Sequence, residues 1–501
     1  MSLAIVNTRA SVGIQAPPVT VEVHLTNGLP GLAIVGLPEA AVRESKDRVR
    51  GALLSSRFDY PARRITVNLA PADLPKDGGR FDLPIAVGIL AASGQLPGAP
   101  LADLELVGEL ALSGGLRPVR GTLAASIAAR DAGRALLVAR GNAAEAAFVP
   151  GARVHGADHL LAVAAHLAGR ERLAEAVRAL PPAGAEGGPD LADVRGQAHA
   201  RRALEVCAAG GHSLLMVGPP GSGKSMLATR LPSILPPLAE EEVLEVAAIA
   251  SVSDEVGWRP ERWSRRPFRA PHHSASPTSL VGGGSLPRPG EVSRAHRGVL
   301  FLDELPEFER RVLDMLREPL ETGAVTIARA ARSETFPARF QLVAAMNPCP
   351  CGHYGSPRCH CPGSVVSRYR ARLSGPLLDR IDLQVEVPPV DEAALFTSAD
   401  RGEASVAVAA RVAAARARQL ARQGGLNRDL AGEQQERWCR LGAGESRLLR
   451  DAMQRLGLTA RSLHRVLRVA RTVADLAGAE TIGTAHLAEA LGYRRLDRAS
   501  G

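Results

Sequence analysis

The chain has 501 residues, of which 46% are hydrophobic and 23% are charged, and its formal net charge is +9. This composition is typical of a globular protein of about three domains, and no apolar run reaches the roughly 20 residues that a membrane-spanning helix needs. The first 18 residues lack the basic stretch and long apolar run of a signal peptide. We therefore expect a cytoplasmic protein that does not associate with a membrane.

Composition divides the chain into four stretches. Residues 1–180 mix strand-like and helix-like runs, and the Pro- and Gly-rich residues 181–190 are typical of a linker. Residues 191–390 alternate strands with helices, whereas residues 391–501 show only the helical periodicity of Ala, Arg and Leu. The prediction is an α/β protein in which an α+β domain precedes a parallel-sheet core and an all-α domain. The N-terminal runs are 19–25, 64–70 and 104–110 for strands, and 39–54 and 121–133 for helices.

Residues 212–235 have the pattern of a buried strand, a glycine-rich turn and a helix. Such a turn points successive backbone N–H groups at an anion, and the helix N-terminus adds its dipole. Lys224 can reach the β- and γ-phosphates of ATP, and the Ser225 hydroxyl can bind Mg²⁺. Lys224 is one of three lysines in an arginine-rich chain, which indicates a place where a guanidinium would not fit. The predicted phosphate loop is Gly218, Pro219, Pro220, Gly221, Ser222, Gly223, Lys224 and Ser225.

Two further apolar runs end in polar side chains. Residues 298–305, GVLFLDEL, end in Asp303, which is predicted to hold Mg²⁺, and Glu304, which is predicted to polarise the attacking water. Residues 340–348, FQLVAAMNP, place Asn347 at the end of a strand, where its amide can orient that water. Taken alone, each run also fits a strand followed by a polar turn.

Several longer strings carry a family resemblance. RPFRAPHHSAS, GGGSLPRPGEVSRAHRGVLFLDELPEF, FQLVAAMNPCPCG and SGPLLDRIDLQVEVPPV closely resemble the ComM/YifB family of magnesium-chelatase-like AAA+ ATPases. The resemblance extends over nearly the whole chain. It implies a homo-oligomer, a hexameric ring, that binds single-stranded or branched DNA. Such a ring would drive branch migration in homologous recombination and natural transformation.

The resemblance also implies roles for individual residues. Asn347 matches the sensor-1 position, Arg380 the arginine finger that reaches the γ-phosphate of a neighbouring subunit, and Arg461 the sensor-2 position. From the residues alone, Arg380 can equally form a surface ion pair with Asp379 or Asp382.

Two basic features can contact nucleic acid. Residues 321–340 have the pattern of a hairpin with a basic tip; the resemblance implies a pore hairpin whose Arg329 and Arg332 contact DNA phosphates. Residues 401–500 contain 18 Arg against 10 Asp and Glu, an excess of +8 that favours a polyanionic partner. The alternatives are a solvated hairpin tip and solvated helix faces.

Four cysteines lie within thirteen residues: Cys349, Cys351, Cys359 and Cys361. Their thiolates can bind a structural Zn²⁺ tetrahedrally, with His353 or His360 as a substitute for one of them. The C-x-C spacing is tighter than in most zinc knuckles. Reduced cysteines in a loop and a redox switch remain open alternatives.

The strings PADLPKDGGRFDLP and LVGELALSGGLRPVRGTLAA are similar to the proteolytic domain of Lon. Arg80 and Leu123 occupy the positions where the catalytic serine and lysine of Lon are expected, although Lys76 and Ser113 lie nearby. We therefore expect a Lon-like fold in residues 1–180 without peptidase activity.

Four functions are compatible with these patterns. An ATP-dependent DNA motor explains the basic regions and the full-length resemblance. The alternatives are the motor ATPase subunit of a metal chelatase, a Lon-like ATP-dependent protease, and a nucleotide-switch scaffold without turnover. The missing Ser–Lys pair argues against the protease, and the presence of Glu304 and Arg380 argues against the scaffold.

Overall fold

The computed structural model describes residues 3–37, 39–179, 188–253, 265–284, 287–329, 332–389 and 402–494. The chain forms two compact units, one of residues 1–183 and 243–264 and the other of residues 184–242 and 265–501. Most of the predicted linker and the predicted border near Asp391 lie outside the described residues.

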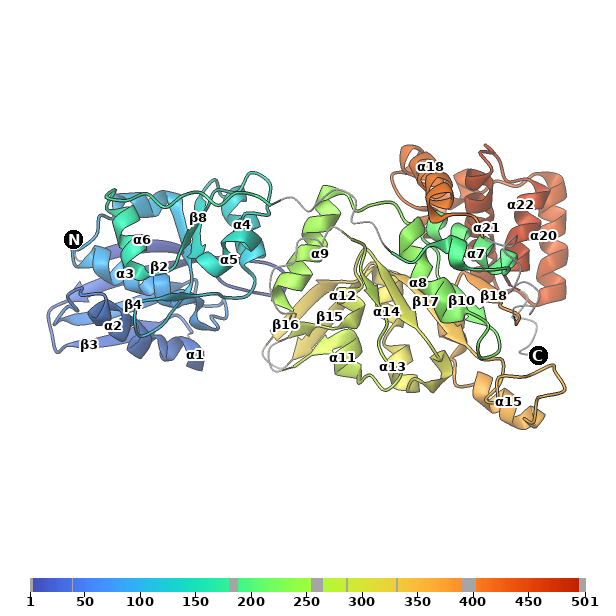
Figure 1. Ribbon diagram of the computed structural model, residues 1–501, viewed down its shortest axis with the longest axis horizontal. Coiled ribbons are helices and arrows are strands. Elements are labelled where there is room, and N and C mark those ends of the chain that lie inside the picture. Colours follow the sequence, from blue (N-terminus) through green and yellow to red (C-terminus); the bar gives the residue numbers. More distant parts are fainter. Residues whose placement is uncertain are drawn as a thin grey trace. The chain divides into compact units, whose positions relative to one another are not determined.

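The N-terminal unit is built on a seven-stranded mixed sheet of order β3-β4-β2-β1-β5-β8-β9. Figure 1 labels its strands β2, β3, β4 and β8. The β1–β2 and β2–β4 pairs are antiparallel, and the other neighbours are parallel. The predicted strand over 104–110 is divided at Gly108, and its last two residues form a separate short hairpin. The strands are β1 Leu3–Arg9, β2 Pro18–Thr26, β3 Gly31–Val35, β4 Arg64–Ala70, β5 Leu104–Val107, β6 Glu109–Leu110, β7 Leu116–Arg117, β8 Ala135–Ala139 and β9 Val154–Ala157.

Helix α3 is the central helix of this unit. All of its residues, Asp82–Ala92, are buried, because its sequence is apolar on every side and it packs on β1 and β2. The predicted helix over 39–54 is interrupted at Glu44. The other helices are α1 Ala40–Arg43, α2 Ser45–Ser55, α4 Thr122–Asp131, α5 Arg140–Ala146 and α6 Leu160–Leu167.

Helix α9, Glu240–Val252, lies within the range predicted for the ATPase core, but from Val243 onward it belongs to the N-terminal unit. Ala247 and Ala248 join a buried cluster with Leu123, Phe148 and Val149. The apolar face of α9 therefore completes the core of a unit whose preceding stretch ends about 60 positions earlier, at residue 183. The N-terminal unit is consequently not a continuous stretch of the chain.

The second unit contains a five-stranded, fully parallel sheet of order β11-β14-β17-β10-β18. Strands β14 and β17 are buried along their whole length, as expected when helices cover both faces of a parallel sheet. All carboxyl ends of these strands therefore lie at one edge, where ligands bind in such sheets. The strands are β10 Leu214–Val217, β11 Phe268–Arg269, β14 Val299–Leu302, β17 Gln341–Met346 and β18 Leu383–Glu386.

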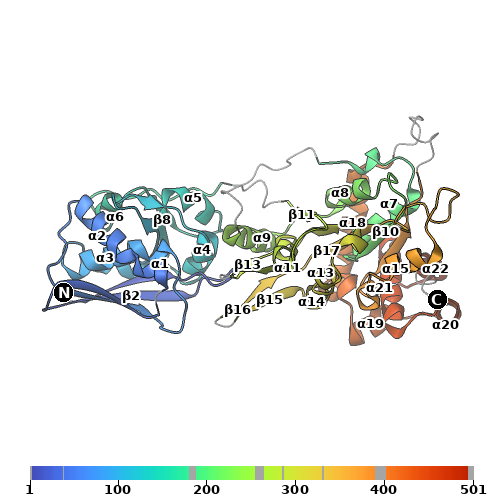
Figure 2. The ribbon, with the colours of Figure 1, turned by 90° about the horizontal axis from the view of Figure 1, so that it is seen from below.

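Two hairpins stand outside this sheet. Strands β15, Ala324–Arg329, and β16, Arg332–Pro337, run side by side in both ribbon views (Figures 1 and 2). The second hairpin pairs β12, Gly282–Gly283, with β13, Arg288–Pro289. In the described part of residues 190–390, the α-helices besides α9 are α7 Ala198–Gly210, α8 Lys224–Ile234, α11 Pro277–Val281, α12 Glu291–Arg294, α13 Arg310–Asp314, α14 Arg317–Thr322, α15 Gly363–Arg370 and α16 Gly375–Leu378.

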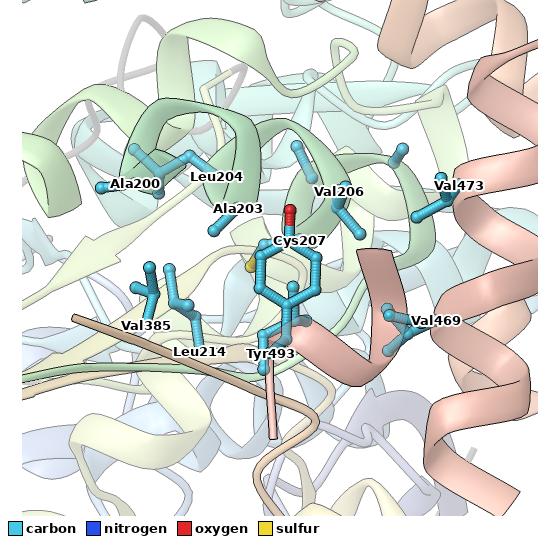
Figure 3. Close-up of a cluster of buried hydrophobic side chains, with 14 of the residues drawn as sticks. Ala200, Ala203, Leu204, Val206, Cys207, Leu214, Val385, Val469, Val473 and Tyr493 are labelled. Atoms are coloured by element: carbon cyan, nitrogen blue, oxygen red, sulfur yellow. The ribbon is translucent and has the colours of Figure 1, made fainter. Parts of the chain in front are cut away.

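The C-terminal helices share one hydrophobic core with this sheet. Tyr493 is fully buried; its ring lies among Val206, Cys207, Leu214 and Val469, which come from α7, β10 and α21 (Figure 3). The helical region and the sheet are therefore one unit rather than two. The helices are α18 Ser405–Gln423, α19 Gly432–Trp438, α20 Ala443–Leu456, α21 Ala460–Leu476 and α22 Thr484–Gly492.

The predicted fold class is confirmed: an α/β chain with a parallel-sheet core and a helical C-terminal region. Within the described ranges, no helix combines the length and the apolar character that crossing a bilayer requires.

Candidate functional site

The loop between β10 and α8 has the backbone that its glycines allow. Gly223 adopts a left-handed conformation, φ 89°, at the start of α8. A Cβ on Gly218 would lie 2.1 Å from the carbonyl oxygen of Val387, just after β18, so no larger residue fits there. The loop Gly218–Ser225 is thus held against the carboxyl end of the sheet with its N–H groups at a helix N-terminus, the geometry that binds phosphate.

Lys224 is buried at the base of this loop. Its Nζ donates to the carbonyl oxygens of Gly218 and Pro219, both at 2.8 Å, and to Asn347 Oδ1 at 3.3 Å. Burial lowers the pKa of Lys224, and the nearby charges of Asp303 and Glu304 oppose that shift. Lys224 therefore lies where β10 and β17 end, and a phosphate competes with backbone carbonyls for its ammonium group.

Ser225 and Asp303 lie in direct contact. Ser225 Oγ donates to Asp303 Oδ2 at 2.6 Å, although the two residues are 78 positions apart. Both side chains offer the oxygen ligands that Mg²⁺ prefers, so the pair fits a magnesium site facing the phosphate loop. Glu304 follows in a left-handed conformation, φ 52°, which turns this exposed carboxylate out of the strand direction.

His273 contacts the predicted catalytic carboxylate, and sequence analysis missed it. Its Nδ1 lies 3.2 Å from Glu304 Oε2, and its ring packs edge-on against Phe308 and beside His272. The contact arises because β11 pairs with β14, which places the segment after β11 beside the residue after β14. The string RPFRAPHHSAS contained the residue, but no local pattern linked it to Glu304.

Arg380 lies elsewhere in the unit and is largely buried. Its guanidinium forms an ion pair with Glu321 and donates to the Pro376 carbonyl at 2.5 Å. The ion pairs with Asp379 or Asp382 that the residues alone allowed are therefore wrong. The carboxylate of Asp382 instead binds Arg465 at 2.7 Å. Within the described residues, the partners of the Arg380 side chain are Glu321 and the Pro376 carbonyl, both outside the phosphate loop of its own chain.

Arg461 lies in the first turn of α21 and is exposed. The backbones of Arg329 and Arg332 pair in register at the ends of β15 and β16, next to a tip that lies outside the described residues. The hairpin itself is thus present as predicted, and the structure leaves its DNA contacts as a prediction.

The four cysteines come together. Their Sγ atoms all lie within 4.8 Å of one another, and this group includes neither His353 nor His360. Cys349 Sγ lies 3.4 Å from Cys351 Sγ and 3.9 Å from Cys359 Sγ, and the Sγ atoms of Cys351 and Cys359 are 3.8 Å apart. All four thiols are free, so none of these contacts is a disulfide.

Family models and curated proteins match nearly the whole chain. Three family models match: "Magnesium chelatase, subunit ChlI" over residues 190–395, "Subunit ChlI of Mg-chelatase" over 21–142 and "Magnesium chelatase, subunit ChlI C-terminal" over 402–494. The YifB protein of Salmonella typhimurium is 53% identical over 99% of this chain and 98% of its own length. Competence protein ComM of Haemophilus influenzae is 52% identical over the same shares.

The chain belongs to the ComM/YifB family of magnesium-chelatase-like proteins.

A true chelatase subunit is much more distant. The 38 kDa magnesium-chelatase subunit of Cereibacter sphaeroides is 31% identical over 22% of this chain and 27% of its own length. The alignment of this ComM/YifB member with that subunit is therefore confined to part of the chain, whereas the three family models together match most of it.

Among the residues described after position 402, more than half of the arginines of this ComM/YifB chain have partners within their own unit. These arginines bind carboxylates or backbone carbonyls. The arginines behind the +8 charge excess of this region are therefore neither all solvated nor all available to a polyanionic partner. The pairs are Arg411 with Glu205 and Glu403, Arg416 with the Ala208 carbonyl, Arg418 with the Asp475 carbonyl, Arg422 with Asp475, Arg428 with the Phe340 carbonyl, Arg465 with Asp382, Arg471 with the Ala479 carbonyl and Asp475, and Arg494 with the Ile381 carbonyl.

The region similar to the Lon proteolytic domain shows no serine–lysine contact among the residues named for it. Lys76 is buried and donates to the Pro71 carbonyl, and burial lowers its pKa. Arg80 is also buried, donates to the Arg120 carbonyl at 2.9 Å, and has a pKa lowered by burial to about 10. The Ser113 carbonyl contacts His159, 46 positions later. The Lys76 and Arg80 side chains are thus bound to backbone carbonyls of their own unit.

Proposed function

We propose that this chain is an ATP-hydrolysing DNA motor that acts as a hexameric ring and promotes branch migration in homologous recombination and natural transformation. The observation that carries the proposal is the match to competence protein ComM over nearly the full length of both chains. Competence is the uptake of DNA by cells, and a motor that moves DNA branches serves the step in which incoming DNA recombines. Membership in a magnesium-chelatase-like family supports ATP and Mg²⁺ as the nucleotide and its ion.

The site supplies a role for each side chain in hydrolysis. Lys224 and the N–H groups of the loop bind the β- and γ-phosphates, and Ser225 and Asp303 hold Mg²⁺. Magnesium neutralises charge that develops between the two phosphates. Glu304 accepts a hydrogen bond from the water that attacks the γ-phosphorus, and Asn347 orients that water from the adjacent strand end.

Arg380 completes the site in a neighbouring subunit. A trans-acting guanidinium stabilises charge that appears only during phosphoryl transfer, and thereby couples hydrolysis to the subunit contact. Its position away from its own phosphate loop supports this division of labour.

A four-way DNA junction with one labelled arm tests the proposal. With ATP and Mg²⁺, the wild-type chain should convert the junction to branch-migration products. Glu304→Gln should bind ATP but leave the junction intact, because it lacks the acceptor for the attacking water. Glu309→Gln is the matched control, since this exposed carboxylate lies five residues later and outside the site. Failure of the wild-type chain to move the branch, together with ATP hydrolysis that DNA does not affect, would favour a chelatase-type motor.

A further inference from the structure

The four-cysteine cluster has the dimensions of a zinc–thiolate site. Zn–S bonds of about 2.3 Å in a tetrahedron place the sulfurs about 3.8 Å apart. The Sγ atoms of Cys349, Cys351 and Cys359 are 3.4, 3.9 and 3.8 Å apart, and Cys361 Sγ lies within 4.8 Å of each. Thiolates are soft ligands that select Zn²⁺ over Mg²⁺, so this ion is distinct from the one bound with ATP.

The segment between these cysteines has few other means of staying folded. Every apolar side chain between positions 350 and 362 is exposed, including Tyr354. A backbone hydrogen bond closes the turn at Cys349–Gly352, and the turn at His353–Ser356 adds only the bond from the Ser356 hydroxyl to the His353 carbonyl. A loop of this kind gains its order chiefly from the ligands that cross-link it.

The same loop packs directly against the phosphate loop. Gly352 has φ 83°, and a Cβ at this position would lie 2.3 Å from Cδ and 2.7 Å from Cγ of Pro220. The turn closed by Cys349 and Cys351 therefore rests on the phosphate loop so closely that only glycine fits.

The chain on either side of the cluster contacts the catalytic groups. Asn347 lies two residues before Cys349, and the helix α15 begins two residues after Cys361. In α15, Arg370 donates to the Pro348 carbonyl at 3.3 Å and lies over the Tyr354 ring at 4.9 Å. The Tyr369 hydroxyl contacts the backbone of Asn347.

The residues after α15 reach the other catalytic strand. Arg372 donates to the Pro306 carbonyl at 3.2 Å and to Glu307 Oε2 at 2.9 Å, in the turn that follows Glu304. Residues 349–372, which we call the cysteine brace, thus touch the phosphate loop, Asn347 and the turn after Glu304.

We propose that the four cysteines bind one Zn²⁺ and that this ion holds the cysteine brace in place, so that ATP turnover requires zinc as well as Mg²⁺. The inference rests on the ATPase activity proposed above. Zinc takes no part in phosphoryl transfer. It keeps Pro220, Asn347 and the turn after Glu304 in their positions relative to one another.

The first experiment measures zinc by mass spectrometry in the full chain purified under reducing conditions. We expect about one Zn²⁺ per chain. We expect none in the double variant Cys351→Ser, Cys361→Ser, and the full amount in Cys439→Ala, whose buried thiol lies outside the cluster. Replacement by Co²⁺ should give the visible absorption of tetrahedral thiolate coordination. Wild-type chain that takes up neither ion would overturn the proposal.

The second experiment measures turnover in the wild-type chain itself, so that misfolding of a variant cannot decide the result. A zinc-selective chelator is added with saturating Mg²⁺ and ATP, and Zn²⁺ is then restored. We expect kcat to fall about tenfold or more and to recover, as when the supports of a site are removed. Full turnover by zinc-free chain would overturn the inference while leaving the ATPase intact. Zinc-dependent turnover that DNA does not stimulate would instead overturn the DNA role alone.

Discussion

The edge of the sheet around Lys224 and the helical region after residue 402 both depend on basic side chains, but in different ways. At the sheet edge, one lysine faces a loop built to bind phosphate, beside the exposed Ser225 and Glu304. In the helical region, arginines such as Arg422 and Arg465 bind internal carboxylates. The difference shows that the geometry around a cation, rather than the number of cations, indicates where an anionic ligand binds.

The largest expected effect is on turnover, and it distinguishes a catalytic arginine from the arginines that bind internal carboxylates. Arg380→Ala should lower turnover about a thousandfold, because an arginine finger contributes at least that much. Steady-state ATP hydrolysis measures the loss. An equal mixture of the Arg380→Ala and Lys224→Ala variants should regain about a quarter of wild-type turnover. In mixed rings, half of the sites keep Lys224, and half of those lie next to a subunit that keeps Arg380. A mixture as inactive as its components would contradict action in trans.

Within the helical region, Asp475 accepts from Arg422 and Asn427 and pairs with Arg471 at 3.0 Å. Asp475→Ala should lower the free energy of unfolding by about 3 kcal/mol, because it leaves buried guanidinium groups unpaired. Urea unfolding measures the change, with Glu433→Ala, an exposed carboxylate on α19, as control. Equal stability of the two variants would show that these arginines are not held by internal charge.

The buried carboxylate of Asp382 should make the stability of the chain depend on pH. Burial opposes its charge, but His212 and Arg465 hold the pKa of this carboxyl well below its usual range. Its contribution to stability is therefore present above the unfolded pKa and is lost as pH falls below about 4. The stability advantage of the wild-type chain over Asp382→Asn, measured by urea unfolding, should shrink in that acid range. A pH-independent difference would exclude the ionised carboxylate as its cause.

A substitution of His273 tests whether its contact with Glu304 at the sheet edge contributes to turnover. His273→Ala should lower kcat about tenfold, because Glu304 loses the side chain that orients it, while the KM for ATP changes little. His272→Ala is the matched control, since its ring lies beside His273 at a tilt and its Nδ1 contacts Ser274. If both variants behaved alike, the contact with Glu304 would have no role in turnover.

The smallest effect concerns the exposed arginines Arg447 and Arg455 on α20. If the helical region contacts DNA, replacing both by Ala should reduce the slope of log affinity against log salt by about 2, with unchanged ATPase activity in the absence of DNA. A salt titration of DNA binding measures this, with the exposed neutral variant Gln454→Ala as control. An unchanged slope would assign DNA binding to other surfaces.

The sequence allowed prediction of those site features that depend on a local pattern or on the order of the parallel strands. The strand–loop–helix around Lys224 is continuous in sequence, and Asp303 and Asn347 meet it because parallel strands end at one edge. The cysteines were predicted as a group because thirteen residues contain all four.

The remaining features depend on side chains that meet across long separations. Glu321 lies 59 residues from its partner Arg380, and no periodicity links them. Helix α9 has an ordinary apolar face, and nothing local indicates that this face packs on Phe148. Likewise, an arginine that binds an internal carbonyl is indistinguishable in sequence from one that faces solvent.

The most direct test of the DNA-motor account is steady-state ATP hydrolysis at low salt, with and without single-stranded and branched DNA. We predict that DNA raises the turnover of the wild-type chain, and that Lys224→Ala and Glu304→Gln abolish hydrolysis under both conditions. Hydrolysis that depends on Lys224 and Glu304 but is indifferent to DNA would contradict the account.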